Sequence, residues 1–187
     1  MPDEFISLEE IEKIPAERCP MICLANGFTS VFGLMISLRL KEFWTHAMWL
    51  MTPEILASQW FWFTRFRIGV FNKHSLKLWW NPRWTPEQRA ILKSEINRRL
   101  AMPKWKTRYD LLAVVGEALG LSWLQNKRVD FCSEAVCNIL AGVEPAIREW
   151  ELFDKSPRPE ELNAWLKAQR NEDETPRYEV YARVMPG

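Results

Sequence analysis

The stretch FWTHAMWLMTPEILASQWFWFTRF, residues 43–66, constrains the fold more than any other part of the chain. Two runs rich in aromatic and branched residues flank a TPE sequence, in which Pro53 suits the second position of a type I turn. This pattern predicts a β-hairpin of strands 43–51 and 55–66. The register of the hairpin decides which side chains share a face, because successive side chains of a strand point to opposite faces of the sheet.

The rest of the chain contains both strand and helix patterns. Thr85 and Pro86 mark the clearest helix start, with a capping residue followed by proline at the first helical position. We expect further strands at 20–26, 67–72, 76–80 and 177–185, and helices at 8–14, 31–43, 85–101, 108–121, 132–142 and 156–170. Strands and helices segregate rather than alternate strictly, which predicts an α+β fold with an antiparallel sheet packed against helices.

Composition divides the chain into three parts and limits its partners. We expect an acidic helical arm at 1–19, a main domain at 20–170, and a linker with a C-terminal strand at 171–187. The 25 Lys and Arg residues nearly balance the 24 Asp and Glu residues. The net charge therefore gives no reason to expect nucleic acid or an anionic membrane as the main partner.

The eleven tryptophans are more than a core of this size comfortably encloses. Indole buries a large area but keeps an N–H group that needs a partner, so tryptophan clusters often lie at interfaces or pocket rims. We therefore expect either a Trp-rich core or a Trp-rich surface used in protein assembly. The sequence has no signal peptide and no uninterrupted apolar span, which predicts no stable membrane insertion and cysteines that remain thiols.

Cys132 is the candidate nucleophile, because it stands where an apolar helix begins. Free N–H groups at a helix N-terminus lower the pKa of a nearby thiol. A thiol nucleophile also needs a base, and the chain has two histidines, His46 within a predicted strand and His74 in a polar connection. His46 is the better candidate, since a strand fixes its ring. Both residues also have a simpler interpretation as buried core side chains.

The third polar group, which would orient the histidine, depends on the hairpin register. With Pro53 and Glu54 as the two turn residues, His46 and Gln59 share a face. A three-residue turn would place Ser58 on that face instead. We therefore take Gln59 as the orienting residue and keep Ser58 as the alternative.

Other chemistries have little support in the sequence. A zinc site could in principle use the four cysteines, but the second pair would lie within one helix and lacks the usual knuckle glycines. These four are Cys19, Cys23, Cys132 and Cys137. There is no Gly-rich phosphate loop and no G-x-S-x-G motif, so we expect no metal and no cofactor.

Three segments, RYDLLAVVG (108–116), DFCSEAVCNIL (130–140) and SPRPEELNAWL (156–166), resemble the C-terminal half of the circularly permuted NlpC/P60-like, or papain-like, hydrolases. That group includes the YiiX/YaeF-type bacterial proteins and, more distantly, the lecithin–retinol-acyltransferase-like proteins. WTHAMWL (44–50) is similar to the family strand that opens with Ser/Thr-His. The resemblance covers residues 20–168, and its most specific element is FCSE after YD. Permutation explains why the histidine precedes the cysteine.

The resemblance implies a permuted papain-like fold in which Cys132 is the nucleophile and His46 the base. Tyr109 would line the site and Glu134 would support the helix start. Many relatives read Glu-Ala after the hairpin turn, where this chain reads ILASQ, so the third residue departs from the family pattern.

The resemblance further implies a cysteine hydrolase that cleaves cell-wall peptide, isopeptide or lipid acyl bonds. The lack of a signal peptide and of a transmembrane helix leads us to expect a cytoplasmic or virion-associated protein. Aromatic walls from Trp60, Trp62 and Trp79 would favour a flat or apolar ligand near the site. The alternative is an inactive papain-like module that serves as a structural or interaction protein, for example in a phage particle.

Overall fold

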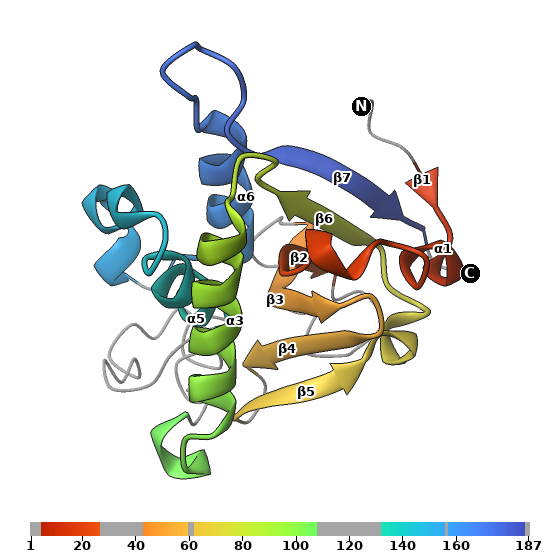
Figure 1. The fold of residues 1–187 in the computed structure, drawn as a ribbon. Helices are drawn as coiled ribbons and strands as arrows, with labels where there is room; N and C mark the ends of the chain where they lie inside the picture. Colours follow the sequence, from red (N-terminus) through yellow and green to blue (C-terminus); the bar gives the residue numbers. More distant parts are fainter. Residues whose placement is uncertain (1–4, 27–42, 60–61, 108–131, 156, 186–187) are drawn as a thin grey trace.

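A computed structural model describes residues 5–26, 43–59, 62–107, 132–155 and 157–185 of the chain. A seven-stranded sheet forms its centre, with the strand order β1-β7-β6-β2-β3-β4-β5 (Figure 1). The strands are β1 (Phe5–Ile6), β2 (Met21–Asn26), β3 (Trp44–Thr52), β4 (Ile55–Gln59), β5 (Phe63–Arg67), β6 (Leu76–Trp80) and β7 (Glu179–Val184).

The described residues contain four α-helices and several 3-10 turns. The helices are α1 (Leu8–Ile11), α3 (Pro86–Leu100), α5 (Cys132–Leu140) and α6 (Pro159–Ala168). The 3-10 turns are η1 (Ala16–Arg18), η2 (Ile68–Phe71), η3 (Lys104–Lys106), η5 (Pro145–Glu149) and η6 (Phe153–Lys155). The expected cap of α3 is confirmed, since the Thr85 hydroxyl accepts a hydrogen bond from the backbone N–H of Gln88.

The α+β class is confirmed, but the sheet is mixed rather than antiparallel. Strand β1 runs parallel to β7 over two residue pairs, and all the remaining pairings between neighbouring strands are antiparallel. A two-residue strand such as β1 is too short for periodicity to reveal it. The parallel pair arises because the two ends of the described chain meet at one edge of the sheet (Figure 1).

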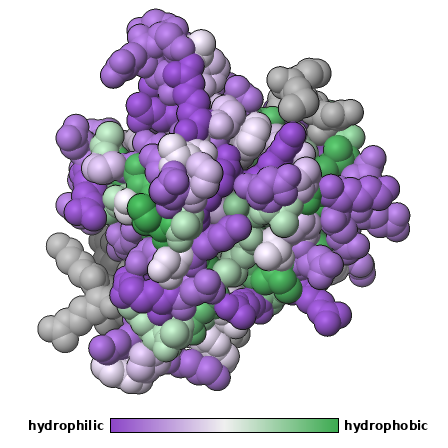
Figure 2. Space-filling view, viewed as in Figure 1, coloured by the Kyte–Doolittle hydropathy of each residue, from purple (hydrophilic) through white to green (hydrophobic). Residues whose placement is uncertain are grey.

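The sheet separates two apolar cores. We call the side covered by α3, α5 and α6 the helix face, and Figure 1 shows these helices gathered at one side of the sheet. Its core includes Ala47 and Trp49 of β3. The opposite face is covered by α1 and η2, and its core includes Met48 and Leu50 of the same strand. The outer surface is mostly hydrophilic with scattered apolar residues in the view of Figure 2.

The β3–β4 hairpin combines the expected turn with an unexpected bulge. Thr52 pairs with Ile55, so Pro53 and Glu54 are the two turn residues, as the sequence predicts. The register then shifts between Leu50 and Thr52, which makes Met51 an extra residue on β3. Beyond the bulge, every β3 residue pairs with a β4 residue one position earlier than the simple register predicts. Each β4 side chain there consequently lies on the other face of the sheet.

Several predicted element bounds are wrong. The run 55–66 is not one strand, because it divides into β4 and an antiparallel β5. The predicted strand 67–72 is mostly the 3-10 turn η2 instead, and this turn buries the side chains of Ile68 and Phe71. The predicted helix 8–14 is helical only through Ile11. The predicted helices 31–43 and 108–121 lie almost wholly outside the described residues.

The terminal segments belong to the same folded unit as the rest of the sheet. Ile11 and Ile14 are buried in the core of the opposite face, and β7 lies between β1 and β6. Residues 5–19 and 179–184, which the sequence assigns to an arm and a C-terminal segment, therefore share the sheet and the core of the opposite face with the rest of the described chain.

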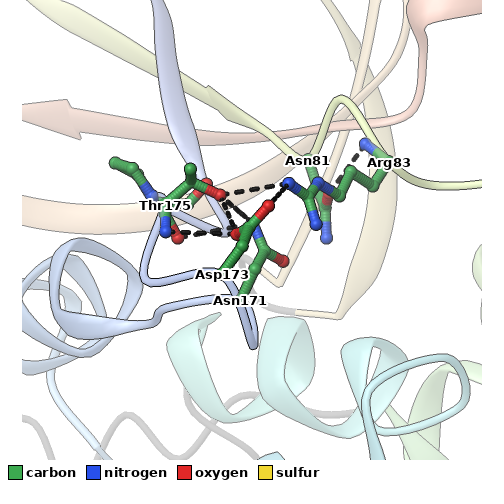
Figure 3. A network of polar contacts seen from close by, with 6 residues as sticks. Asn81, Arg83, Asn171, Asp173 and Thr175 are labelled. Atoms are coloured by element: carbon green, nitrogen blue, oxygen red, sulfur yellow. Dashed lines mark hydrogen bonds and ion pairs between the residues drawn. The ribbon is translucent and has the colours of Figure 1, made fainter.

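The segment 171–176, expected to be an exposed linker, is an exposed turn held by side chains (Figure 3). The Asp173 carboxylate accepts hydrogen bonds from the backbone N–H and the hydroxyl of Thr175, at 3.2 and 2.5 Å. Arg83, in the connection after β6, forms a 2.5 Å ion pair with the same carboxylate. These bonds lower the pKa of Asp173 to about 2, so the network persists through neutral pH.

Candidate active site

Cys132 is the first described residue of α5 and is enclosed by the helix-face core. Its side chain is 3% exposed, and it packs in the same cluster as Ala47 and Trp49 of β3. The apolar residues of α5, among them Val136 and Ile139, face the sheet and hold the helix start against β3. The predicted packing of this helix on the strand that carries His46 is therefore confirmed.

The environment of the Cys132 sulfur contains opposing influences on its pKa. Burial raises the pKa, because a thiolate loses hydration in an apolar core. Hydrogen bonds from the backbone of Ala47, Ser133 and Cys132 itself lower it. Burial is the larger effect, so the net shift is upward and the resting group is a thiol. The backbone donors nevertheless provide partners for negative charge on the sulfur.

The other three cysteines lack this set of donors. Burial raises the pKa of Cys19 to about 11 and raises the pKa values of Cys23 and Cys137 further. The expectation that they are structural is consistent with these environments. The zinc alternative is wrong, because Cys19 and Cys23 lie in the core of the opposite face, whereas Cys132 and Cys137 lie in the helix-face core.

His46 is held by a short hydrogen bond across the hairpin. Its Nε2 atom lies 2.6 Å from the Oγ atom of Ser58. The Ser58 hydroxyl also lies 3.5 Å from the backbone carbonyl oxygen of Gln59, to which it can donate. The tautomer of His46 with the proton on Nε2 fits this series of hydrogen bonds, since His46 then donates to the Ser58 hydroxyl and Ser58 donates to the Gln59 carbonyl. Nδ1 is left as the basic nitrogen in that tautomer.

Ser58, not Gln59, is the residue that contacts His46, which corrects the predicted third residue. The bulge at Met51 pairs Met48 with Ser58, so Ser58 takes the face of the sheet that the simple register assigned to Gln59. The Gln59 side chain is fully buried and donates from Nε2 to the backbone carbonyl of Thr107. Its Oε1 atom has no hydrogen-bond partner within the described part of the chain.

The His46 ring is neutral at physiological pH. Burial lowers its pKa to about 4, with a smaller contribution from the positive charge that His74 can carry nearby. His74 is itself half-buried, packs edge-on against Phe71, and has a pKa lowered by burial. The ring of His46 is therefore in the form that accepts a proton.

Strand parity gives the spatial relationship between the two candidate groups. His46 pairs with Ala25, which belongs to the core of the opposite face, whereas Ala47 belongs to the core that encloses Cys132. The sulfur reaches the backbone of β3 at Ala47, next to His46 in the chain. The Cys132 sulfur and the His46 ring therefore lie on opposite faces of β3, with the backbone of the strand between them, and do not face each other across an open cleft.

Two residues beside Cys132 have different roles. The Ser133 hydroxyl is buried and donates to the carbonyl of Pro157, which ties the start of α5 to the segment before α6. The sequence does not predict this contact, although the Ser-Pro pair at 156–157 marks the segment that provides the acceptor. Glu134 is half-buried, and its negative charge partly opposes the lowering of the Arg99 pKa by burial. Glu134 thus supports the contact between α5 and α3.

The remaining predicted site residues are not brought together by the described structure. Tyr109 and Trp60 lie outside the described residues. Trp79 is buried beneath α6, where its Nε1 donates to Asn163 at 3.2 Å. Trp62 is 38% exposed and stands just before β5. The described positions of Trp62 and Trp79 do not form one aromatic wall.

No protein-family model, no curated protein and no solved structure matches this chain. The described residues include no group of three or more side chains arranged to hold a metal ion. In the described part of the chain, none of the helices combines the length and apolarity needed to span a bilayer.

Proposed function

We propose that the protein is a cysteine hydrolase with a permuted papain-like fold, in which Cys132 is the nucleophile and His46 the general base. One observation carries this proposal: the sulfur at the start of α5 is hydrogen-bonded to the backbone of Ala47, the residue that follows His46. The partial resemblance of the FCSE and WTHAMWL segments to the permuted NlpC/P60-like hydrolases supports the same assignment.

The reaction begins with a neutral thiol and a neutral imidazole. The His46 ring has to move past the backbone of β3 to reach the sulfur in this scheme. It then takes the thiol proton as the Cys132 sulfur attacks the substrate carbonyl carbon, and the carbonyl oxygen becomes an oxyanion. The bond from that carbon to the leaving nitrogen or oxygen then breaks, and His46 returns the proton to the leaving group. Water hydrolyses the thioester, with His46 again as the base, and Cys132 regains its proton.

Ser58 positions the base in this scheme. Its Oγ accepts the Nε2–H group of His46 and holds the ring in the tautomer whose Nδ1 atom is basic. The low pKa of His46 makes the imidazolium short-lived, so proton return to the leaving group is favoured. Backbone N–H groups at Cys132 and Ser133 are positioned near the sulfur and can stabilise charge that develops there.

The substrate class in this proposal is an amide, isopeptide or acyl ester, as the family resemblance implies. Gln59 follows Ser58 along β4, so its side chain lies on the helix face, as the Cys132 side chain does.

The proposal is tested with p-nitrophenyl acetate as the acyl donor and mass spectrometry of the intact protein. We expect one acetyl group on the wild-type chain, located at Cys132, and none on the Cys132→Ala variant. Cys137→Ala is the matched control, because Cys137 lies one helical turn further along α5 and should leave acetylation unchanged. Equal acetylation of the wild type and of Cys132→Ala, with both folded, would refute the enzyme assignment.

A second candidate function is an inactive papain-like module that serves as a structural or interaction protein. The enclosure of Cys132, at 3% exposure with a pKa raised by burial, favours it. This candidate predicts that the folded wild type gains no acetyl group while the unfolded chain reacts with iodoacetamide at all four thiols. The acetylation experiment therefore separates the two candidates directly.

A further inference from the structure

Two exposed tryptophans, each covered by a lysine, lie together at one end of the molecule. Trp105 of η3 is 74% exposed and Trp62, just before β5, is 38% exposed. The ammonium nitrogen of Lys104 lies 4.3 Å from the centroid of the Trp62 ring, and that of Lys106 lies 5.2 Å from the Trp105 ring. We call these four residues the Trp–Lys patch. Figure 1 shows η3 beyond the end of α3 and close to the start of β5.

The exposure of the patch contrasts with the rest of the tryptophans that the structure places in the cores. Trp44, Trp49, Trp79 and Trp84 are all at most 8% exposed. Burying an indole is strongly favourable, so a tryptophan that remains 74% exposed leaves a large area available to a partner. Tryptophan is also the side chain that prefers the boundary between water and lipid.

The charge around the patch is positive, although the whole chain is nearly neutral. The described residues from Ala101 to Thr107, AMPKWKT, include two basic residues and no acidic residue. The last turn of α3 carries Arg98 and Arg99, but Arg98 is paired with Glu95 and Arg99 is buried, so the positive charge of the patch comes from Lys104 and Lys106. Net charge conceals this local excess, because acidic residues elsewhere balance it. A surface with exposed indoles and clustered lysines is complementary to anionic lipid headgroups.

We propose that the Trp–Lys patch docks the protein on the surface of an anionic lipid bilayer. The indoles enter the headgroup region and the lysine ammonium groups contact lipid phosphates, while the chain remains peripheral. Single-stranded nucleic acid is a poorer fit, since Lys104 and Lys106 each lie over one face of an indole and leave at most the other face of each ring for a base to stack on. The inference is independent of the catalytic assignment of Cys132.

Co-sedimentation with lipid vesicles tests the proposal with the full chain. We expect binding to vesicles of mixed phosphatidylcholine and phosphatidylglycerol, weaker binding to pure phosphatidylcholine, and loss of the difference at high salt. Trp105→Ala should weaken binding about tenfold, and the double variant Lys104→Glu, Lys106→Glu should remove the preference for phosphatidylglycerol. Circular dichroism confirms that each variant is folded.

Phe5→Ala is the matched control, because Phe5 is 62% exposed at the distant β1 edge and should bind vesicles as the wild type does. Equal binding of the wild type to both kinds of vesicle would overturn the proposal. It would also be overturned if Trp105→Ala bound as tightly as the wild type, or if a poly-dT oligonucleotide displaced the protein from vesicles. Self-association through the patch without vesicle binding would identify a second copy as the occupant instead.

Discussion

The Nε2 atom of His46 lies 2.6 Å from the Oγ atom of Ser58, across a hairpin whose register is shifted by one residue. The bulge at Met51 makes this contact possible, because it moves Ser58 onto the face of His46. The Ser58 hydroxyl therefore lies where a group that orients the proposed base, His46, would have to lie. His46 and Ser58 belong to neighbouring strands, so the pairing of β3 with β4, and not a loop, fixes the distance between these two atoms.

Removal of the Ser58 hydroxyl should impair the base without unfolding the chain. Ser58→Ala removes the hydrogen bond between Oγ and Nε2 of His46, and the loss of one hydrogen bond of about 1 kcal/mol corresponds to a roughly fivefold to tenfold slower acetylation of Cys132. The measurement is the initial rate with p-nitrophenyl acetate. Ser58→Thr keeps the hydroxyl and should retain most of the rate, whereas equal rates for Ser58→Ala and the wild type would exclude a positioning role.

The four thiols should differ in reactivity in the folded protein. Burial raises the pKa of each, but only the Cys132 sulfur is hydrogen-bonded to the backbone of a neighbouring strand as well as to its own helix start. Iodoacetamide at neutral pH should therefore modify Cys132 first, and mass spectrometry of peptides identifies the site. Modification of Cys19 or Cys137 at the same rate as Cys132 would contradict this prediction.

His46 should make the fold sensitive to mild acid. Its pKa is about 4 in the folded protein and 6.5 as the ordinary value, so the unfolded chain binds more protons between these limits. Stability is fully present above about pH 6.5 and falls as the pH decreases toward 4, by up to roughly 3 kcal/mol. Urea unfolding of the wild type and of His46→Gln measures it, and the variant should lose less stability over that range. Parallel pH curves would contradict it.

The turn at Asp173 should protect its own backbone from proteolysis. Asp173→Ala removes the acceptor for Thr175 and the ion pair with Arg83. A glutamyl endopeptidase should then cut after Glu172 and Glu174 several-fold faster than in the wild type, as an opened loop exposes its backbone. Asp154→Ala, a change at another exposed acidic residue, is the control. Unchanged cleavage in Asp173→Ala would show that the network does not order the turn.

The sequence predicts the elements of this fold better than their exact pairing. The Pro53 turn, the Thr85 cap and the apolar helix at Cys132 follow from local rules, because each depends on a few neighbouring residues. The bulge at Met51 does not, since a one-residue insertion leaves no mark in the alternation of a strand that is buried on both faces. The predicted orienting residue is wrong by one position for that reason.

Contacts between distant segments were also beyond local rules. The hydrogen bond from Ser133 to the Pro157 carbonyl joins residues 24 positions apart. The pairing of β1 with β7 joins the two ends of the described chain, and its two-residue length carries no periodicity. Part of the Trp–Lys patch is visible in the sequence as KWK, residues 104–106, but the net charge of the whole chain does not reveal this local excess of positive charge. Only the exposure of Trp105 distinguishes the patch from an ordinary basic run.

The rate of Cys132 acetylation in wild type and His46→Ala, at neutral pH and with both proteins shown to be folded, tests the central claim most directly. General-base catalysis contributes about a hundredfold or more. The account predicts a loss of at least that size in His46→Ala, with the residual acetyl group still on Cys132. Equal rates in the two proteins would contradict it, because the imidazole would then have no part in activating the sulfur.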